Sequence, residues 1–377
     1  MGVVRFDQIA RECRETFKGS IEGKPIVGLE HIEPYDMLLK NYDVDVETTF
    51  TKSFKKGQIL FGRRRAYQHK ACVATCDGIC SGDITVIEPI EDAVYPDLLP
   101  FIIQNDDFFE HAIKGSNGAL SPRVKWEHMA NFEVDLPSIY EQKVLADKLW
   151  AAYEVKQSYL KMIDATDEMV NAQFIEMFGN STTDKKWNIM KLQDIVHPDC
   201  PISYGIVQPG EGYETGVPVV RPVDLNINYY VYRDGLKLTT EEISNSYKRT
   251  ILRGDEILLC VRGTTGLMGI ATEELKGCNV TRGITPLYFK EGFNRYYILG
   301  VFLSEEIQNY IKRYTIGSTL KGINMERVRV IPVPIPPYEL QCKYELVFKQ
   351  ADKSKAELRK SIDAIDKVIK SLINENL

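Results

Sequence analysis

The chain contains 377 residues, of which 44% are hydrophobic and 27% charged, so it has the composition of a folded globular protein with room for two domains. No apolar run reaches the roughly 18 residues that a transmembrane helix needs, and the charged first residues exclude a signal peptide. The net charge of −6 excludes a uniformly basic surface for nucleic acid, although it leaves room for local basic patches.

Short strands and two helices are expected in the globular parts of the chain, in a mixed α/β pattern. The predicted strands are short runs punctuated by glycine or proline. Two longer segments are predicted to be helical. In chain order we expect strands at 58–61 and 84–88, a helix at 98–113, strands at 217–220, 256–261 and 285–289, and a helix at 296–310.

Four short motifs recur in the same order in the two halves of the chain, with a nearly constant offset of about 193 to 200 residues. Any single match is weak, but four in the same order indicate an internal duplication. A period near 200 residues is too long for a solenoid repeat, so we expect a duplicated domain. The pairs are Lys24–Ile32 with Val217–Leu225, Lys56–Leu60 with Arg253–Leu258, Gly118–Leu120 with Ser318–Leu320, and Leu136–Gln142 with Ile335–Gln341.

Each copy ends in a long, mostly polar segment that follows a proline and is predicted to form one helix. In the second copy, apolar residues step by 4, 3, 4 and 3 positions, the a/d pattern of a coiled coil. The first copy has a similar stripe, interrupted at Lys156 and Thr166. A helix of about 35 residues measures about 50 Å and outreaches its own domain, so we expect the two helices to pair with each other, antiparallel. The predicted packing residues are Leu149, Ile163, Val170, Leu358, Ile362, Ile365, Ile369 and Leu372.

The expected fold is α/β in the mixed α+β sense, with two similar globular domains that are each followed by a long helix. We predict the first globular domain at 1–138, its helix at 139–178, the second globular domain at 179–338 and its helix at 339–377. Gly179–Trp187 is predicted to be a linker, because a glycine ends the first helix and polar residues follow it.

The ordered motifs of both copies resemble those of the specificity (S) subunits of type I DNA restriction-modification systems. The first copy carries Gly28–Ile32 and Leu136–Gln142 of this pattern. It differs in having Phe61–Arg65 opposite Cys260–Gly263, and it lacks a counterpart of Tyr204–Pro209. The second copy carries the clearer set, which comprises Tyr204–Pro209, Gly216–Arg221 with Asp224, Gly254–Leu258, Arg262–Gly266, Gly317–Leu320, and Ile331–Pro337 with Gln341.

The resemblance implies two target-recognition domains, each of which binds one half of a split sequence in double-stranded DNA. It implies that the helices set the spacing between them and dock the methyltransferase (M) subunits, two in number, while restriction/translocase (R) subunits join through the complex. S-adenosylmethionine, ATP and Mg would be bound by those partners for adenine-N6 methylation and cleavage, and this chain would bind no cofactor. We expect the chain in the prokaryotic cytoplasm and not at a membrane.

No motif of an enzyme competes with this interpretation, and we predict no catalytic residue. Gly263–Gly266 lacks the lysine of a phosphate-binding loop. Ile335 precedes a Pro-Pro-Tyr sequence but lacks the amide or carboxylate that adenine methyltransferases place there. Cys72, Cys76 and Cys80 have no obvious second couple of ligands, so buried thiols are favoured and no metal is predicted. Eight cysteines in so long a chain indicate a reducing compartment, not a disulfide framework.

Positive residues cluster locally although the chain is acidic overall. Residues 63–70 combine cations with an aromatic and an amide. Arginine can bind guanine through two hydrogen bonds and glutamine can bind adenine, whereas lysine mainly neutralises phosphate. The alternative for each cluster is a solvated surface loop. The candidate DNA contacts are Arg63, Arg64, Arg65, Tyr67, Gln68, Lys70, Asn117, Ser121, Arg123 and Lys125 in the first copy, and Arg262, Thr264, Thr265, Arg282, Lys312, Arg313, Ser318 and Lys321 in the second.

Two alternatives stay open on the sequence alone. One is a specificity subunit of another restriction class, whose partner fuses methylase and nuclease in one polypeptide; the neighbouring genes decide that. The other is a scaffold whose copies bind protein and not DNA. The scaffold predicts that Arg63→Ala and Arg262→Ala leave the DNA affinity of the assembled complex unchanged.

Overall fold

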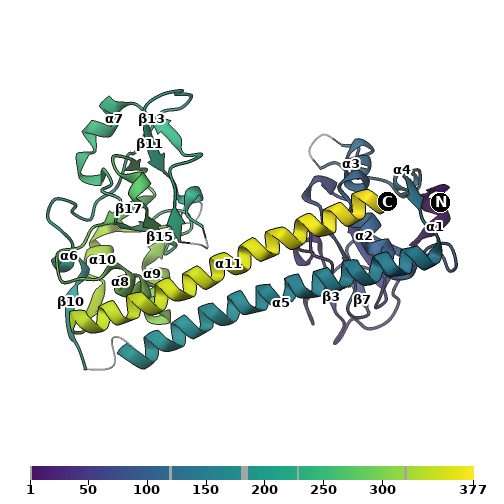
Figure 1. Ribbon diagram of the computed structural model, residues 1–377, viewed down its shortest axis with the longest axis horizontal. Helices are drawn as coiled ribbons and strands as arrows, with labels where there is room; N and C mark the ends of the chain where they lie inside the picture. The colour runs from purple at the N-terminus through teal and green to yellow at the C-terminus, as the bar shows by residue number, and fades with distance from the viewer. Residues whose placement is uncertain (1, 119–120, 180–185, 227–228, 318–320) are drawn as a thin grey trace. The chain divides into compact units, whose positions relative to one another are not determined.

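The computed structural model describes residues 2–118, 121–179, 186–226, 229–317 and 321–377, and the chain has a mixed α/β fold (Figure 1). It divides into two compact units. Unit 1 comprises Met1–Lys161 and Leu358–Leu377, and unit 2 comprises Met162–Glu357. The boundaries fall inside the two long helices, α5 (Ile139–Phe178) and α11 (Tyr338–Asn376), so each unit contains part of both. Of the predicted linker Gly179–Trp187, residues 180–185 lie outside the described residues.

Unit 1 is built on a four-stranded antiparallel sheet with the order β2-β8-β5-β6. Strands β5 and β8 form its centre, because their residues are mostly apolar or β-branched and buried. A three-stranded sheet (β3-β7-β4) and the pair β1-β9 complete the unit. The elements are β1 (Gly2–Arg5), α1 (Phe6–Ile9), β2 (Ala10–Cys13), β3 (Ile26–Val27), β4 (Lys52–Phe54), β5 (Ile59–Gly62), β6 (Ala71–Val73), β7 (Gly78–Cys80), β8 (Ile84–Pro89), α2 (Leu99–Gln104), α3 (Asp106–Lys114), α4 (Trp126–Met129) and β9 (Glu133–Leu136).

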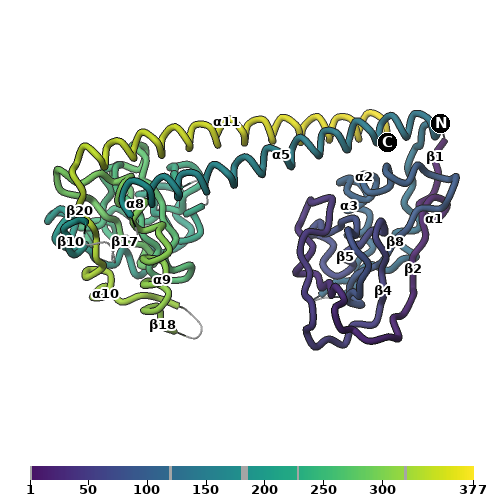
Figure 2. The backbone as a smooth tube through the Cα atoms, turned by 90° about the horizontal axis from the view of Figure 1, so that it is seen from below, coloured from purple at the N-terminus to yellow at the C-terminus, as the bar shows by residue number. Residues whose placement is uncertain are grey.

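Unit 2 has a similar plan around the sheet β12-β15-β14-β17, in which β12 pairs parallel with β15, and it also has a three-stranded sheet β13-β11-β16. The antiparallel pair β10-β20 leads into α11 (Figure 2). The elements are β10 (Asn188–Lys191), α6 (Leu192–Ile195), β11 (Val217–Val220), β12 (Tyr230–Val231), β13 (Lys237–Thr239), α7 (Glu241–Ser246), β14 (Ile257–Cys260), β15 (Met268–Ala271), β16 (Asn279–Val280), β17 (Ile284–Leu287), α8 (Arg295–Leu303), α9 (Glu305–Tyr314), β18 (Thr315–Ile316), β19 (Gly322–Ile323), α10 (Met325–Arg329) and β20 (Pro332–Ile335).

The glutamines that mark the sequence repeat occupy equivalent positions in the two units. Gln142 Oε1 accepts from the Tyr95 N–H at 2.9 Å, and its Nε2 donates to the Pro137 carbonyl at 2.9 Å. Gln341 makes the same two bonds in unit 2, from the Asn294 N–H and to the Pro336 carbonyl, both at 2.9 Å. Both glutamines are buried. The glutamines of the sequence repeat therefore make matching bonds in the two units.

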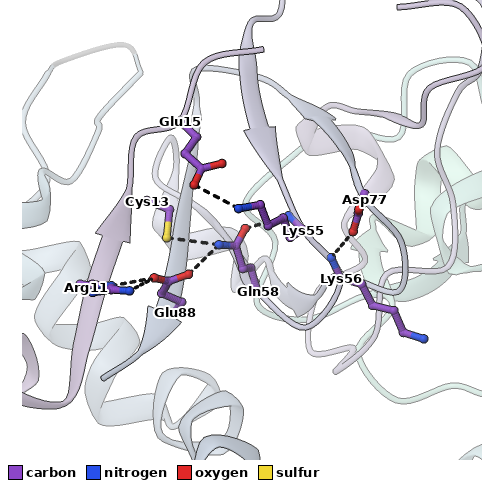
Figure 3. Close-up of polar contacts among 8 residues, drawn as sticks. All are labelled: Arg11, Cys13, Glu15, Lys55, Lys56, Gln58, Asp77 and Glu88. Atoms are coloured by element: carbon purple, nitrogen blue, oxygen red, sulfur yellow. Dashed lines mark hydrogen bonds and ion pairs between the residues drawn. The ribbon is translucent and has the colours of Figure 1, made fainter. Parts of the chain in front are cut away.

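The turn before the central strand is also shared. Gln58 accepts from the Lys55 N–H at 2.8 Å, and its amide donates to Glu88 at 2.8 Å (Figure 3). At the equivalent turn of unit 2, Glu256 accepts from the Arg253 N–H at 2.5 Å. Burial raises the pKa of Glu256, against the effect of the main-chain bonds to its carboxylate. A side chain three residues after the turn start thus holds both turns closed.

Replacing Gln341 with leucine is expected to destabilise unit 2 by about 1–3 kcal/mol, because it leaves the buried Asn294 N–H and Pro336 carbonyl without their partner. Urea unfolding monitored by tryptophan fluorescence measures this change. Lys343→Ala, at an exposed position two residues along the same helix, is the matched control and is expected to stay within about 0.5 kcal/mol. A Gln341→Leu protein as stable as the control would contradict the assignment.

The prediction of a single helix at 98–113 and another at 296–310 was wrong, because each range contains two consecutive helices. Asn105 ends α2 and caps α3, where its side chain accepts from the Asp107 N–H at 3.3 Å. Ser304 ends α8 and caps α9, and its hydroxyl accepts from the Ile307 N–H at 3.5 Å. Both residues have extended backbone, which interrupts the helix and redirects it.

Within unit 1, the first half of α5 contacts the last turns of α11. Leu149 of α5 and Ile373 of α11 belong to the same buried apolar cluster. Lys156, which interrupts the apolar stripe in the sequence, donates through Nζ to Asp366 Oδ1 at 2.6 Å. The lysine that interrupts the apolar stripe of α5 therefore forms an ion pair with α11.

Within unit 2, the second half of α5 contacts the first half of α11. The ring of Phe174 lies 5.1 Å from that of Tyr344, and the buried Lys355 donates to Asp167 Oδ1 at 2.5 Å. Of the predicted packing residues, Leu149, Val170 and Ile362 are buried, and Ile163, Leu358, Ile365, Ile369 and Leu372 are half-buried.

Candidate nucleic-acid interface

Two of the predicted basic stretches of unit 1 meet through their main chains. The Arg65 N–H donates to the Pro122 carbonyl at 2.8 Å, and the Val124 N–H donates to the Arg63 carbonyl at 3.0 Å. Arg64 lies between these bonds and faces Arg123 in an antiparallel bridge. Residues separated by about sixty positions in the sequence therefore form one surface.

Asp83, which the sequence analysis did not single out, organises the arginines of this surface. Its carboxylate accepts from Arg123 Nε at 2.7 Å and from Arg64 Nη1 at 3.2 Å. Arg64 Nε also donates to Ser121 Oγ at 2.5 Å. Burial opposes ionisation of Asp83, but the hydrogen bonds and charges of Arg123 and Arg64 lower its pKa below the ordinary value. The carboxylate thus holds both guanidinium groups in fixed orientations.

The other candidates of unit 1 differ in how far they reach solvent. Tyr67 is 53% exposed, whereas the ammonium of Lys70 donates inward to the Leu29 carbonyl at 2.6 Å. The Nε atoms of Arg63 and Arg65 are buried and have no partner among the described residues. Arg63 and Gln68 are half-buried, and Asn117, Arg123 and Lys125 are exposed.

Two of the candidates of unit 2, Arg262 and Arg282, lie over Tyr204, the first residue of the Tyr204–Pro209 motif. The guanidinium of Arg262 lies 5.4 Å from the centre of the Tyr204 ring, and that of Arg282 lies 5.9 Å from it. Such cation–π contacts orient an arginine without neutralising it. Tyr204 was missed as a site residue because it lies about 58 positions before Arg262 in the sequence.

A pocket of about 380 Å³ is lined by residues of the Gly263 turn, of α9 and of β18, together with Gly317 and Lys321. It includes three predicted residues, Thr265, Lys312 and Lys321. Thr264 and Arg313, which adjoin Thr265 and Lys312 in the sequence, are exposed to solvent. Ser318 lies outside the described residues.

The two surfaces are equivalent in backbone and different in side chains. The Arg65 N–H bond to Pro122 corresponds to the Gly263 N–H bond to the Lys321 carbonyl, at 2.9 Å. Arg65 and Gly263 both have left-handed backbone, with φ of 57° and 85°. The bridge of Arg64 with Arg123 corresponds to that of Arg262 with Gly322. One scaffold therefore presents two different sets of groups.

Of the three cysteines that were considered as metal ligands, two are core residues and Cys76 is half-buried. Cys72 and Cys80 are buried, and burial raises the pKa of Cys80 to about 12. Among the described residues, no group of three His, Cys, Asp or Glu side chains is placed to hold a metal ion. No helix in the described part of the chain is long and apolar enough to cross a membrane.

Residues 184–365 match the family described as the type I restriction modification DNA specificity domain. The chain is 23% identical over 313 residues to the EcoBI specificity subunit of Escherichia coli, covering 71% of this chain and 64% of that protein. It is 20% identical over 318 residues to the MjaVIII specificity subunit of Methanocaldococcus jannaschii, covering 79% and 73%. The chain thus spans less than two thirds of the length of the E. coli relative.

Two solved structures share the fold. A chain in a structure concerned with assembly and conformational transition of the type I R-M system matches with a TM-score of 0.55 at 16% identity, covering 100% of this chain and 97% of that chain. The type I restriction-modification S subunit from M. genitalium matches with a TM-score of 0.53 at 13% identity, covering 99% and 96%.

Proposed function

We propose that this chain, which belongs to the family of type I restriction specificity subunits, selects the DNA target of a restriction-modification complex in which each unit binds one half of a split sequence. The observation that carries the proposal is the pair of equivalent surfaces, one in each unit, that present different cations on the same backbone. Equivalent scaffolds with different side chains suit the recognition of two different short sequences.

The side chains of both surfaces have the chemistry for this task. Arg64 and Arg262 would face base edges, where a guanidinium can bind guanine through two hydrogen bonds. Lys312 and Lys321, which line the pocket of unit 2, would neutralise phosphate and set the position of the duplex. The acidic balance of the whole chain implies that partner subunits supply much of the remaining phosphate contact.

The long helices are proposed to pair antiparallel and to set the distance between the half-sites. This proposal is supported by the contacts inside each unit, where opposite ends of α5 and α11 meet. Modules related by a twofold axis bind half-sites about one helical turn, roughly 34–36 Å, apart. The target would then be two short sequences separated by bases that are not recognised.

The same helices are proposed to dock the methyltransferase subunits. Apolar side chains that are exposed along both helices support this, because docking a partner would bury them. On α5 they include Tyr140, at 77% exposure, and Met162; on α11 they include Leu346, at 68%. S-adenosylmethionine, ATP and Mg²⁺ would be bound by the methyltransferase and restriction subunits, and this chain would contribute recognition without catalysis.

Co-purification with the cognate methyltransferase, followed by sequencing of methylated adenines in cells that carry both, tests the proposal. We expect a stable complex and a methylated motif of two defined blocks separated by unspecified bases. A contiguous methylated motif, or no complex-dependent methylation, would contradict it.

A further inference from the structure

A cavity of unit 1, here called the flank cavity, lies next to the surface that Arg64 and Arg123 form. It has a volume of about 550 Å³. Arg63 lines it, whereas Arg64 and Arg123 do not. Successive side chains of a bridged segment point to opposite sides, so the cavity lies on the flank of that surface. Its lining comprises three cations, two carboxylates and an aromatic ring, namely Arg14, Arg63, Lys125, Glu12, Glu127 and Trp126.

Both carboxylates of the flank cavity are occupied by one of its cations. Arg14 Nε donates to Glu12 Oε2 at 2.8 Å, and Arg14 Nη2 lies 3.9 Å from Glu127. In the described part of the chain, neither Arg63 nor Lys125 has a carboxylate within ion-pair distance, and the buried Nε of Arg63 has no hydrogen-bond partner. The cavity therefore contains two cations whose charge is not balanced by the protein.

Unit 2 has an apolar residue in place of the unpaired arginine. The Val124 N–H donates to the Arg63 carbonyl at 3.0 Å, and the Ile323 N–H donates to the Val261 carbonyl at the same distance. Val261 is completely buried, whereas Arg63 is half-buried. A half-buried guanidinium without a partner loses solvation that a buried valine does not need.

Unit 2 also has a capping residue in place of the unpaired lysine. Asn324 precedes α10, where its side chain accepts from the Glu326 N–H at 3.2 Å. Lys125 precedes α4 in the same way, but its ammonium has only donors and forms no cap. Unit 1 thus has, at two neighbouring positions, cations that stabilise the fold less than the residues of unit 2 do. A ligand of opposite charge would account for both.

We propose that Arg63 and Lys125 form a binding site for one phosphate of the DNA backbone in unit 1, and that unit 2 has no such site at the equivalent position. Lysine and arginine contact phosphate oxygens without reading the base sequence. When Arg64 faces the base edges of a groove, the flank of the same surface faces the backbone that borders the groove. The inference rests on the proposed function, because it requires DNA to lie against Arg64.

The salt dependence of DNA binding by the assembled complex tests the site. Lys125→Gln is expected to reduce the slope of log affinity against log salt by about 0.9, the value for one phosphate. Between about 50 and about 200 mM salt, the variant complex should therefore lose affinity roughly threefold less than the unaltered complex. The change is expected on the target duplex and on an unrelated duplex alike, because a backbone contact is independent of sequence.

Two further lysine variants distinguish this site from a general effect of charge. Lys18→Gln, at an exposed lysine of unit 1 outside the flank cavity, is the matched control and is expected to keep the slope of the unaltered complex. Lys125→Arg retains the charge and is expected to keep it as well. A Lys125→Gln complex with the same slope as the Lys18→Gln complex would overturn the proposal.

The double variant Arg63→Val with Lys125→Asn copies unit 2 and separates binding from folding. We expect it to bind DNA with a reduced salt slope, while its midpoint of urea unfolding equals or exceeds that of the unaltered chain. A lower midpoint together with an unchanged salt slope would show that the two cations serve the fold, which would contradict the proposal.

A series of duplexes, each with one phosphate replaced by a neutral methylphosphonate, locates the contact. We expect one position, at the block recognised by unit 1, where this replacement weakens binding of the unaltered complex roughly threefold or more. At that position the Lys125→Gln complex should be unaffected. If the two complexes respond alike at every phosphate, the site does not exist.

The remaining outcomes separate this inference from the proposed function. A complex that does not distinguish its target from scrambled duplexes, but whose salt slope falls with Lys125→Gln, would contradict the proposed function and leave the phosphate site in place. Weaker co-purification of Lys125→Gln with the methyltransferase, at an unchanged salt slope, would assign the cations to an acidic protein partner and overturn the inference.

Discussion

Replacing Arg262 with alanine is expected to weaken binding of the assembled complex to its DNA target by about 1–3 kcal/mol, or roughly 5- to 150-fold. The guanidinium is held over the Tyr204 ring and next to the Gly322 strand, so its orientation is set before DNA arrives. The loss should appear as relaxed sequence preference in the block recognised by unit 2. Fluorescence anisotropy with duplexes altered at single positions measures both effects.

Arg233→Ala is the matched control for this experiment, since Arg233 is an exposed arginine of the same unit outside the Tyr204 cluster. It is expected to reduce affinity only slightly and equally for all duplexes. If Arg262→Ala also leaves affinity and preference unchanged, the protein-interaction scaffold becomes the better account of the chain.

Replacing Phe174 with alanine is expected to destabilise unit 2 by about 3–5 kcal/mol, the cost of deleting a buried phenylalanine ring. Phe174 packs between Tyr344 of α11 and Tyr297 of α8, at 5.1 and 5.8 Å between ring centres. It also covers Gly300, where a Cβ would lie 2.7 Å from the phenylalanine ring. No smaller apolar side chain fills this space, so a cavity remains at the point where both long helices meet the globular core.

The neighbouring Ile175 supplies the control, because 54% of it is exposed. Ile175→Ala is expected to change stability by less than about 0.5 kcal/mol. Unfolding in urea is followed by the fluorescence of Trp187, whose indole donates to the Phe178 carbonyl at 2.9 Å and therefore reports on this junction. Equal midpoints for the two variants would show that Phe174 does not support the packing of unit 2.

The sequence repeat was recognisable because it contains residues that make the same local bonds in each copy. Gln142 and Gln341 each bind a carbonyl five residues earlier in the chain. Strands such as β11 were predictable because a short, continuous apolar run between turn residues is typical of a buried strand. The helix breaks at Asn105 and Ser304 were missed, although both are good capping residues, because the flanking apolar segments continue across them.

The site was predictable only in part, because its residues meet through tertiary contacts. The basic composition of 63–65 and 117–125 identified both stretches, but their pairing depends on the Arg65 and Val124 main-chain bonds. Asp83 carries no signal of its own in the sequence, and Tyr204 is marked only as part of the Tyr204–Pro209 motif, with nothing that ties it to the arginines. Their importance follows from the arginines that surround them.

Replacing residues 1–138 by the corresponding segment of a related chain with another target tests most directly whether the two units recognise DNA independently. The hybrid is combined with the same methyltransferase, and its methylated adenines are sequenced. We expect one block of the motif to change to that of the donor, while the other block and the spacing between them stay as in the parent chain. A hybrid that forms the complex but changes both blocks, or neither, would contradict the account.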